Sequence, residues 1–184
     1  WYKKNAPHFL TDFILSSVDR SVHNSFKERG SSVCTSKSSK TMTTLEDVIV
    51  LTQQTIESIL TKPKCTKKLL SKPPFRFLHD IVTGVMNVTG FPEHYFTAQE
   101  LDSANFNDKT SKVAFIEKLI RLVSMGVGEM LPTRASKVVS GTEPLLTNLL
   151  ITEYAKLAVD DSIDREAIIA RSLGQGEIEN MLNE

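Results

Sequence analysis

The side chains that most often carry out catalysis are few and far apart in this sequence. The histidines form no His-Glu-x-x-His pattern, the cysteines no Cys-x-x-Cys pair, and no glycine-rich phosphate loop or Gly-x-Ser-x-Gly turn is present. His79 and Asp80 are adjacent, so on a helix their side chains diverge by about 100° and make no acid–base dyad. We interpret His79 as a helix-surface or half-buried residue. The sequence predicts a non-enzyme without catalytic residues, metal or cofactor.

Basic residues are concentrated in one short segment. Six of them and no acidic residue lie between Ser58 and His79, whereas the segment from Glu153 to the end has eight acidic residues and three basic ones. Two interpretations are open: a solvated loop, or a patch that attracts an acidic surface with an affinity that falls as salt rises. The six residues are Lys62, Lys64, Lys67, Lys68, Lys72 and Arg76.

Composition excludes several other classes of partner. The 22 basic and 22 acidic residues give no net charge, and the patch lacks interleaved aromatic residues for base stacking, so we expect no nucleic-acid partner. No stretch reaches the roughly 18–20 apolar residues of a membrane span, so we expect no membrane insertion. Cys34 and Cys65 make no disulfide framework, which favours reduced thiols in the cytoplasm.

Apolar residues spaced by three and four predict four main helices with short extra helices, and therefore an all-α fold. A capping box from Thr43 to Glu46 opens the first helix, and a second box from Thr97 to Glu100 opens a short helix or turn. We expect Gly126 and Gly128 to end the third main helix. The main helices are expected from 43 to about 60, from 73 to 89, from 108 to about 125 and from 144 to about 157, with one helical turn at 134–139 and a last helix, capped by Asp161 or Ser162, that ends near 173.

The chain divides into three parts. Residues 1–42 are expected to be a flexible or non-native extension with one short helix, since residues 30–42 are rich in Ser and Lys and the first methionine is Met42. Residues 43–173 form the folded domain. Residues 174–184 form an acidic tail.

The block Lys-Lys-Leu-Leu-Ser-Lys-Pro-Pro-Phe-Arg-Phe-Leu-His-Asp-Ile at 67–81 resembles a known family. Its counterpart is the N-terminal domain of the microtubule-interacting subunit of intraflagellar transport complex B. Leu145-Leu146 and residues 131–136 depart from the family pattern, and the family's charged middle region and coiled coil are missing. Further matches extend the resemblance over about residues 45–173: Thr89-Gly90-Phe91, Asp108-Lys109, Lys112 to Ile116, Gly128-Glu129, Lys137 to Pro144 and Thr147 to Leu150.

The resemblance implies a calponin-homology-like fold and a module that binds tubulin or microtubules. It implies that the basic residues of the 67–81 block face the acidic surface of tubulin. Arg134 and Lys137 would extend the patch if their loop comes close to it in the fold. In the full-length protein, other intraflagellar transport subunits would be partners, and the location would be the cytoskeleton, the cilium and the ciliary basal body.

Other functions compete with tubulin binding. The domain could be a structural adaptor that docks on other transport subunits through apolar surface, and exposed Leu145 and Leu146 would favour that function. Actin binding is suggested by the wider calponin-homology superfamily, but fold alone does not assign it.

Overall fold

A computed structural model describes residues 44–173. The predicted N-terminal extension and acidic tail lie outside these residues, as does Thr43. The elements are α2 (Leu45–Ile59), α3 (Lys67–Ser71), α4 (Phe75–Thr89), α5 (Ala98–Leu101), the 3-10 helix η1 (Ser103–Asn105), α6 (Lys109–Val127), α7 (Ala135–Ser140), α8 (Pro144–Val159) and α9 (Arg165–Ser172). The described part of the chain is all-α, as predicted, and contains no strand.

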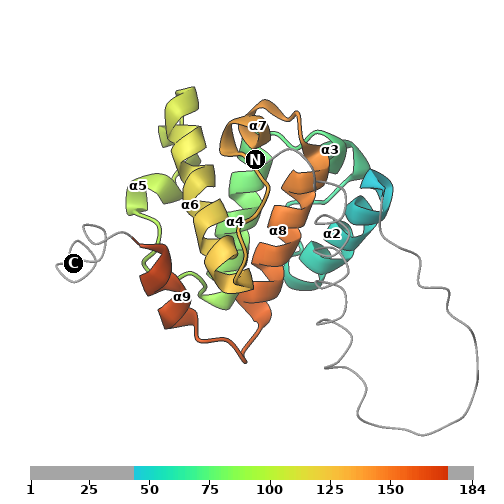
Figure 1. The fold of residues 1–184 in the computed structure, drawn as a ribbon. Helices are drawn as coiled ribbons and strands as arrows, with labels where there is room; N and C mark the ends of the chain where they lie inside the picture. The colour runs from blue at the N-terminus through green and yellow to red at the C-terminus, as the bar shows by residue number, and fades with distance from the viewer. Residues whose placement is uncertain (1–43, 174–184) are drawn as a thin grey trace, which may run out of the picture.

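The four long helices α2, α4, α6 and α8 point in the same general direction (Figure 1). Two contacts agree with this direction for α4, α6 and α8. Phe75 at the start of α4 contacts Phe115 in the first half of α6, and Gly126 near the end of α6 lies against Leu157 near the end of α8. Helix α8 contacts α2, α3, α4, α6 and α7 and is buried on nearly all sides. The starts of α4, α6 and α8 therefore share one end of the bundle.

Several helix ends follow the predicted signals. Thr97 and Glu100 form the complete capping box of α5, the Asp108 carboxylate accepts from Ser111 N at 2.9 Å at the start of α6, and Pro144 opens α8. In contrast, Thr44 caps α2, because its hydroxyl oxygen accepts from Asp47 N at 3.2 Å. The predicted box is thus one residue early.

The predicted cap of the last helix is wrong. Asp164 caps α9 by accepting from Ala167 N at 2.9 Å. The Asp160 carboxylate instead accepts from Ser162 N at 2.9 Å and so closes the turn after α8. Asp161 forms an ion pair with Arg165 at 2.9 Å. The two predicted caps thus belong to the turn that precedes the helix.

Gly126 does not end α6, as the sequence suggested; it lies within the helix. A Cβ atom there would lie 2.5 Å from Leu157 Cδ1, so the missing side chain allows α6 and α8 to approach closely. The terminator is Gly128, which caps α6 with φ +83°. Within residues 44–173, no helix is long and apolar enough to cross a bilayer.

The thiol of Cys65 should be nearly unreactive in the folded protein. The residue is 1% exposed, and burial raises the thiol pKa from 9.0 to about 11. In a Cys34→Ser variant at about pH 8, we expect a disulfide reagent to react about a hundredfold more slowly than in denatured protein, because the thiolate is that much scarcer. Since the folded pKa is the higher one, the same group should lower stability as pH rises from about 9 to about 11. Equal rates in the folded and denatured protein would contradict this burial.

Candidate functional site

All eight cations predicted to bind a partner have exposed side chains. They lie in the α2–α3 loop, on α3 and its C-cap, on the first turn of α4, and on α7 and its N-cap. Exposure makes each of them available to a partner, so their relative positions decide which can act together. They are Lys62, Lys64, Lys67, Lys68, Lys72, Arg76, Arg134 and Lys137.

The α2–α3 loop runs back along α2 and separates the cations at its two ends. Gln53, in the middle of α2, donates to the carbonyl oxygen of Cys65, and Lys67 Nζ lies 2.7 Å from Glu46 Oε1 on the first turn of α2. At 1.5 Å per residue, the start and end of α2 are about 20 Å apart. Lys62, which follows directly after α2, therefore lies far from Lys67, and Lys64 lies between them. The six clustered cations do not form one compact patch.

Helix α3 is fixed so that its cations point outward. Thr66 caps it by accepting from Leu69 N at 3.3 Å, and the Leu70 side chain is fully buried. The Leu70 carbonyl oxygen accepts from Asn148 Nδ2 of α8 at 2.8 Å. With Leu70 anchored in this way, Lys67, Lys68 and Lys72 remain on the solvent side.

Helix α7 meets the end of α3. Gly141, the C-cap of α7, lies against the aliphatic stem of Lys72, whose Cγ would be 3.2 Å from a Cβ at that position. Figure 1 shows α3 and α7 at the end of the bundle where α4, α6 and α8 begin. The C-terminal end of α7, one turn after Lys137, therefore comes close to Lys72, whereas Arg134 lies at the opposite end of this short helix.

Lys112 is a further cation at this end, and the sequence reasoning did not select it. Its Nζ lies 5.9 Å from the ring centroid of Phe75, the neighbour of Arg76. Lys112 lies 36 positions after Arg76 in the sequence, and only the packing of α6 against α4 brings them together. The available signal was a lysine on the first turn of a helix that packs on α4. We define the basic end as Lys67, Lys68, Lys72, Arg76, Lys112, Arg134 and Lys137.

Local carboxylates neutralise only part of the basic end. Lys67 pairs with Glu46, and a hydrogen bond from Lys67 lowers the pKa of the Glu46 carboxyl group. Arg76 lies 3.6 Å from Asp80. Both pairs are exposed, and such pairs typically contribute about 0–1 kcal/mol, so a partner can compete for these cations. Among residues 44–173, no carboxylate pairs with Lys68, Lys72, Arg134 or Lys137.

The direction of the long helices adds to the positive potential. An α-helix carries a partial positive charge at its N-terminus, and α4, α6 and α8 begin at the basic end. Their dipoles and the side-chain cations thus act with the same sign on an approaching anion. This arrangement of charges favours an approaching anion over an approaching cation.

His79 is a structural residue and is fully covered, contrary to the predicted exposed or half-buried position. Its side chain is 2% exposed and packs against the rings of Phe75, Phe106 and Phe115. The covering rings Phe106 and Phe115 come from later segments, so local sequence could not reveal the burial. His79 Nε2 lies 2.9 Å from the Glu100 carbonyl oxygen.

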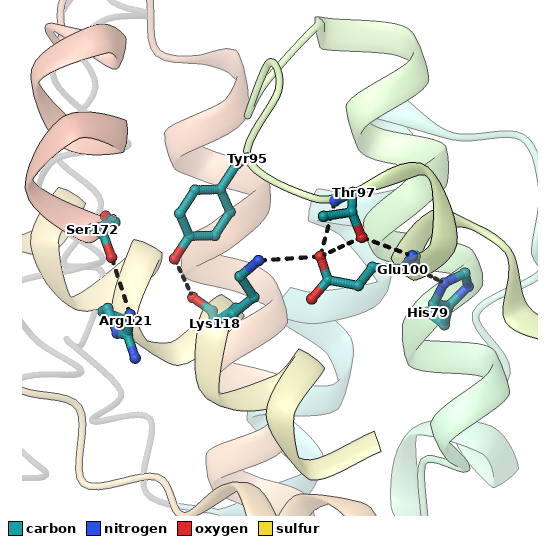
Figure 2. A network of polar contacts seen from close by, with 7 residues as sticks. All are labelled: His79, Tyr95, Thr97, Glu100, Lys118, Arg121 and Ser172. Carbon is teal, nitrogen blue, oxygen red and sulfur yellow. Dashed lines mark hydrogen bonds and ion pairs between the residues drawn. The ribbon is translucent and has the colours of Figure 1, made fainter. Parts of the chain in front are cut away.

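Glu100 is the centre of a polar network that connects several elements (Figure 2). Its carboxylate accepts from Thr97 N at 2.9 Å and pairs with Lys118 Nζ at 3.1 Å. Tyr95 donates to the Lys118 carbonyl oxygen at 3.0 Å. These contacts hold α5 and the segment before it against α4 and α6. In the part of the chain that the structure describes, no three His, Cys, Asp or Glu side chains are grouped to hold a metal ion.

Residues 44–173 thus form an all-helical domain with one basic end, and its class is calponin-homology-like. Residues 48–160 match the family model described as "Microtubule-binding protein MIP-T3 CH-like domain". The chain therefore belongs to the MIP-T3 family of microtubule-binding proteins, over its calponin-homology-like domain.

Curated relatives agree with this assignment. The chain is 42% identical over 123 residues to TRAF3-interacting protein 1 of Danio rerio. The matched region covers 67% of this chain and 20% of the relative. It is 39% identical over 121 residues to the protein of the same name from Mus musculus, which covers 66% of this chain and 19% of the relative. The chain thus spans about a fifth of the length of these relatives.

Proposed function

We propose that the domain binds tubulin or microtubules through the basic end and catalyses no reaction. The observation that carries the proposal is the contact between the Lys72 stem and Gly141, which joins the cations of α3 to those of α7. Lys68, Lys72, Arg134 and Lys137 are each exposed, and within residues 44–173 none of them pairs with a carboxylate. Membership of a microtubule-binding family supports the identity of the partner. Lys62 and Lys64 would contribute less, since they lie farther along α2.

The proposal extends to the cellular setting. The family resemblance supports a location on the cytoskeleton, in the cilium and at the ciliary basal body, with other intraflagellar transport subunits bound through other parts of a longer protein. These partners are proposed for the whole protein, of which the present domain corresponds to about a fifth in the curated relatives.

Binding in a salt series tests the electrostatic mechanism. The fraction of the 184-residue chain that pellets with microtubules gives its affinity at each salt concentration. We expect this affinity to fall at least about tenfold between low salt and about 0.5 M salt, where the Debye length is about 4 Å. The reason is that dissolved ions screen the attraction between exposed lysines or arginines and the carboxylates of a partner. Pelleting that is unchanged at high salt would refute the mechanism.

Salt-resistant binding would instead support the adaptor function through apolar surface. The structure gives that function little support. Leu145 and Leu146 are half-buried and pack against the core. The large exposed apolar residues of the described chain lie on different elements, namely Val50 on α2, Val88 on α4, Met130 after α6 and Val159 at the end of α8.

A further inference from the structure

Asn148 lies where α8 meets the backbone of α3. Its side chain is fully buried, and Nδ2 donates to the carbonyl oxygens of Leu70 at 2.8 Å and Pro144 at 2.7 Å. The backbone carbonyl oxygen of Asn148 accepts from Thr152 Oγ1 at 2.9 Å. Thr152 Oγ1 in turn lies 3.0 Å from Thr52 Oγ1 of α2. A buried polar strip therefore connects α2, α8 and α3.

Apart from the buried Leu70 side chain, helix α3 has few polar contacts that could fix its orientation. It has five residues, too few for a helix that is stable by itself, and the carbonyl groups at its C-terminal end have no helical partner. The pair between Lys67 and Glu46 is exposed and contributes little. Within residues 44–173, Asn148 provides the one side-chain hydrogen bond to the backbone of residues 67–71 from outside α3 and its cap.

In the Asn148 side chain, Nδ2 donates two hydrogen bonds, whereas Oδ1 accepts none from the described residues. Its Oδ1 atom is buried without a hydrogen-bond partner in the described chain, which is an energetic cost that an apolar side chain of similar size would avoid. The amide compensates by satisfying the Leu70 carbonyl, which would otherwise be buried and unpaired. The interaction therefore serves the connection to α3.

We propose that Asn148 is a positioning residue for the basic end: by holding the Leu70 carbonyl, it fixes α3 and thereby the orientation of Lys67, Lys68 and Lys72 toward the partner. This inference rests on the proposed function, because it assumes that these lysines contact tubulin. The buried Asn148 amide acts on the exposed lysines through the Leu70 backbone carbonyl group that it binds.

The variant Asn148→Ser tests the local effect. A serine can still bond the Pro144 carbonyl four residues earlier but cannot reach the Leu70 carbonyl. In the 184-residue chain we expect faster deuterium exchange of the amides of residues 66–72 and weaker pelleting with microtubules, by about threefold to tenfold. Thr152→Val is the matched control: it removes buried hydrogen bonds one turn away on α8 without touching α3, and it should leave pelleting unchanged even though it lowers the melting temperature.

A double-mutant cycle separates positioning from general destabilisation. In a background of Lys67→Gln, Lys68→Gln and Lys72→Gln, Asn148→Ser should have no further effect on pelleting, because there are no α3 cations left to position. The positioning role is wrong if Asn148→Ser weakens pelleting equally in the unchanged chain and in the triple lysine variant. It is also wrong if Asn148→Ser has no effect on the pelleting of the unchanged chain. In both cases the proposed function stands. If the triple lysine variant itself pellets like the unchanged chain, the α3 part of the proposed surface is wrong, and the positioning role falls with it.

Discussion

Reversing two charges at the basic end, with Lys72→Glu and Lys137→Glu, should weaken microtubule binding by at least about thirtyfold at about 0.1 M salt. Each reversal removes an attraction to the acidic partner and adds a repulsion of similar size. The two side chains come from α3 and α7, whose ends meet at Gly141, so a single acidic surface would contact both. Co-sedimentation with microtubules over a range of tubulin concentrations measures the change.

A control of equal charge tests whether position matters. Lys62→Glu with Lys64→Glu changes the net charge by the same amount, but both residues lie farther along α2 from the basic end. We expect less than about a threefold loss for this pair, since screening removes most of an interaction beyond the Debye length of about 10 Å at 0.1 M salt. Equal losses for the two pairs would indicate binding through overall charge and would contradict a localised surface. Circular dichroism should be unchanged in both variants, because all four side chains are exposed.

Replacement of Phe115 by alanine should lower the free energy of unfolding by about 3–5 kcal/mol. Phe115 is fully buried at the centre of an aromatic cluster, with ring centroids 4.8 Å from Phe96, 5.1 Å from His79 and 5.4 Å from Phe106. The cluster connects α4 and α6 with the segment between them, so the cavity would weaken several contacts at once. Because domains of this size are stable by only about 5–15 kcal/mol, the loss should be large in urea denaturation.

The matched control is Val88→Ala on the exposed side of α4. Val88 is 63% exposed, and alanine is a better helix former, so we expect a change within about 0.5 kcal/mol. A loss for Phe115→Ala as small as that of Val88→Ala would show that the aromatic cluster does not hold the domain together.

Local signals in the sequence predict the helices well because they act within a few residues. The oxygen atoms of Thr97 and Asp108 cap helices at the predicted places, and Pro144 begins α8. Errors occur where two candidate caps stand close together, as at Thr43 and Thr44 or at Asp161 and Asp164. There the choice depends on which register turns the apolar residues toward the core, and the core is built from distant segments.

Sequence alone was sufficient to predict the helical class and to name a set of basic residues that are exposed in the fold. Hydrophobic periodicity and capping chemistry are properties of neighbouring residues, and charge can be counted directly. The grouping of those charges depended on three-dimensional packing: α7 joins α3 through Gly141 and Lys72, Lys112 reaches α4 over Phe75, and Lys62 falls outside the group. The physical reason is that contacts between residues tens of positions apart form only when the helices close around a common core, and no local pattern in the chain encodes that closure.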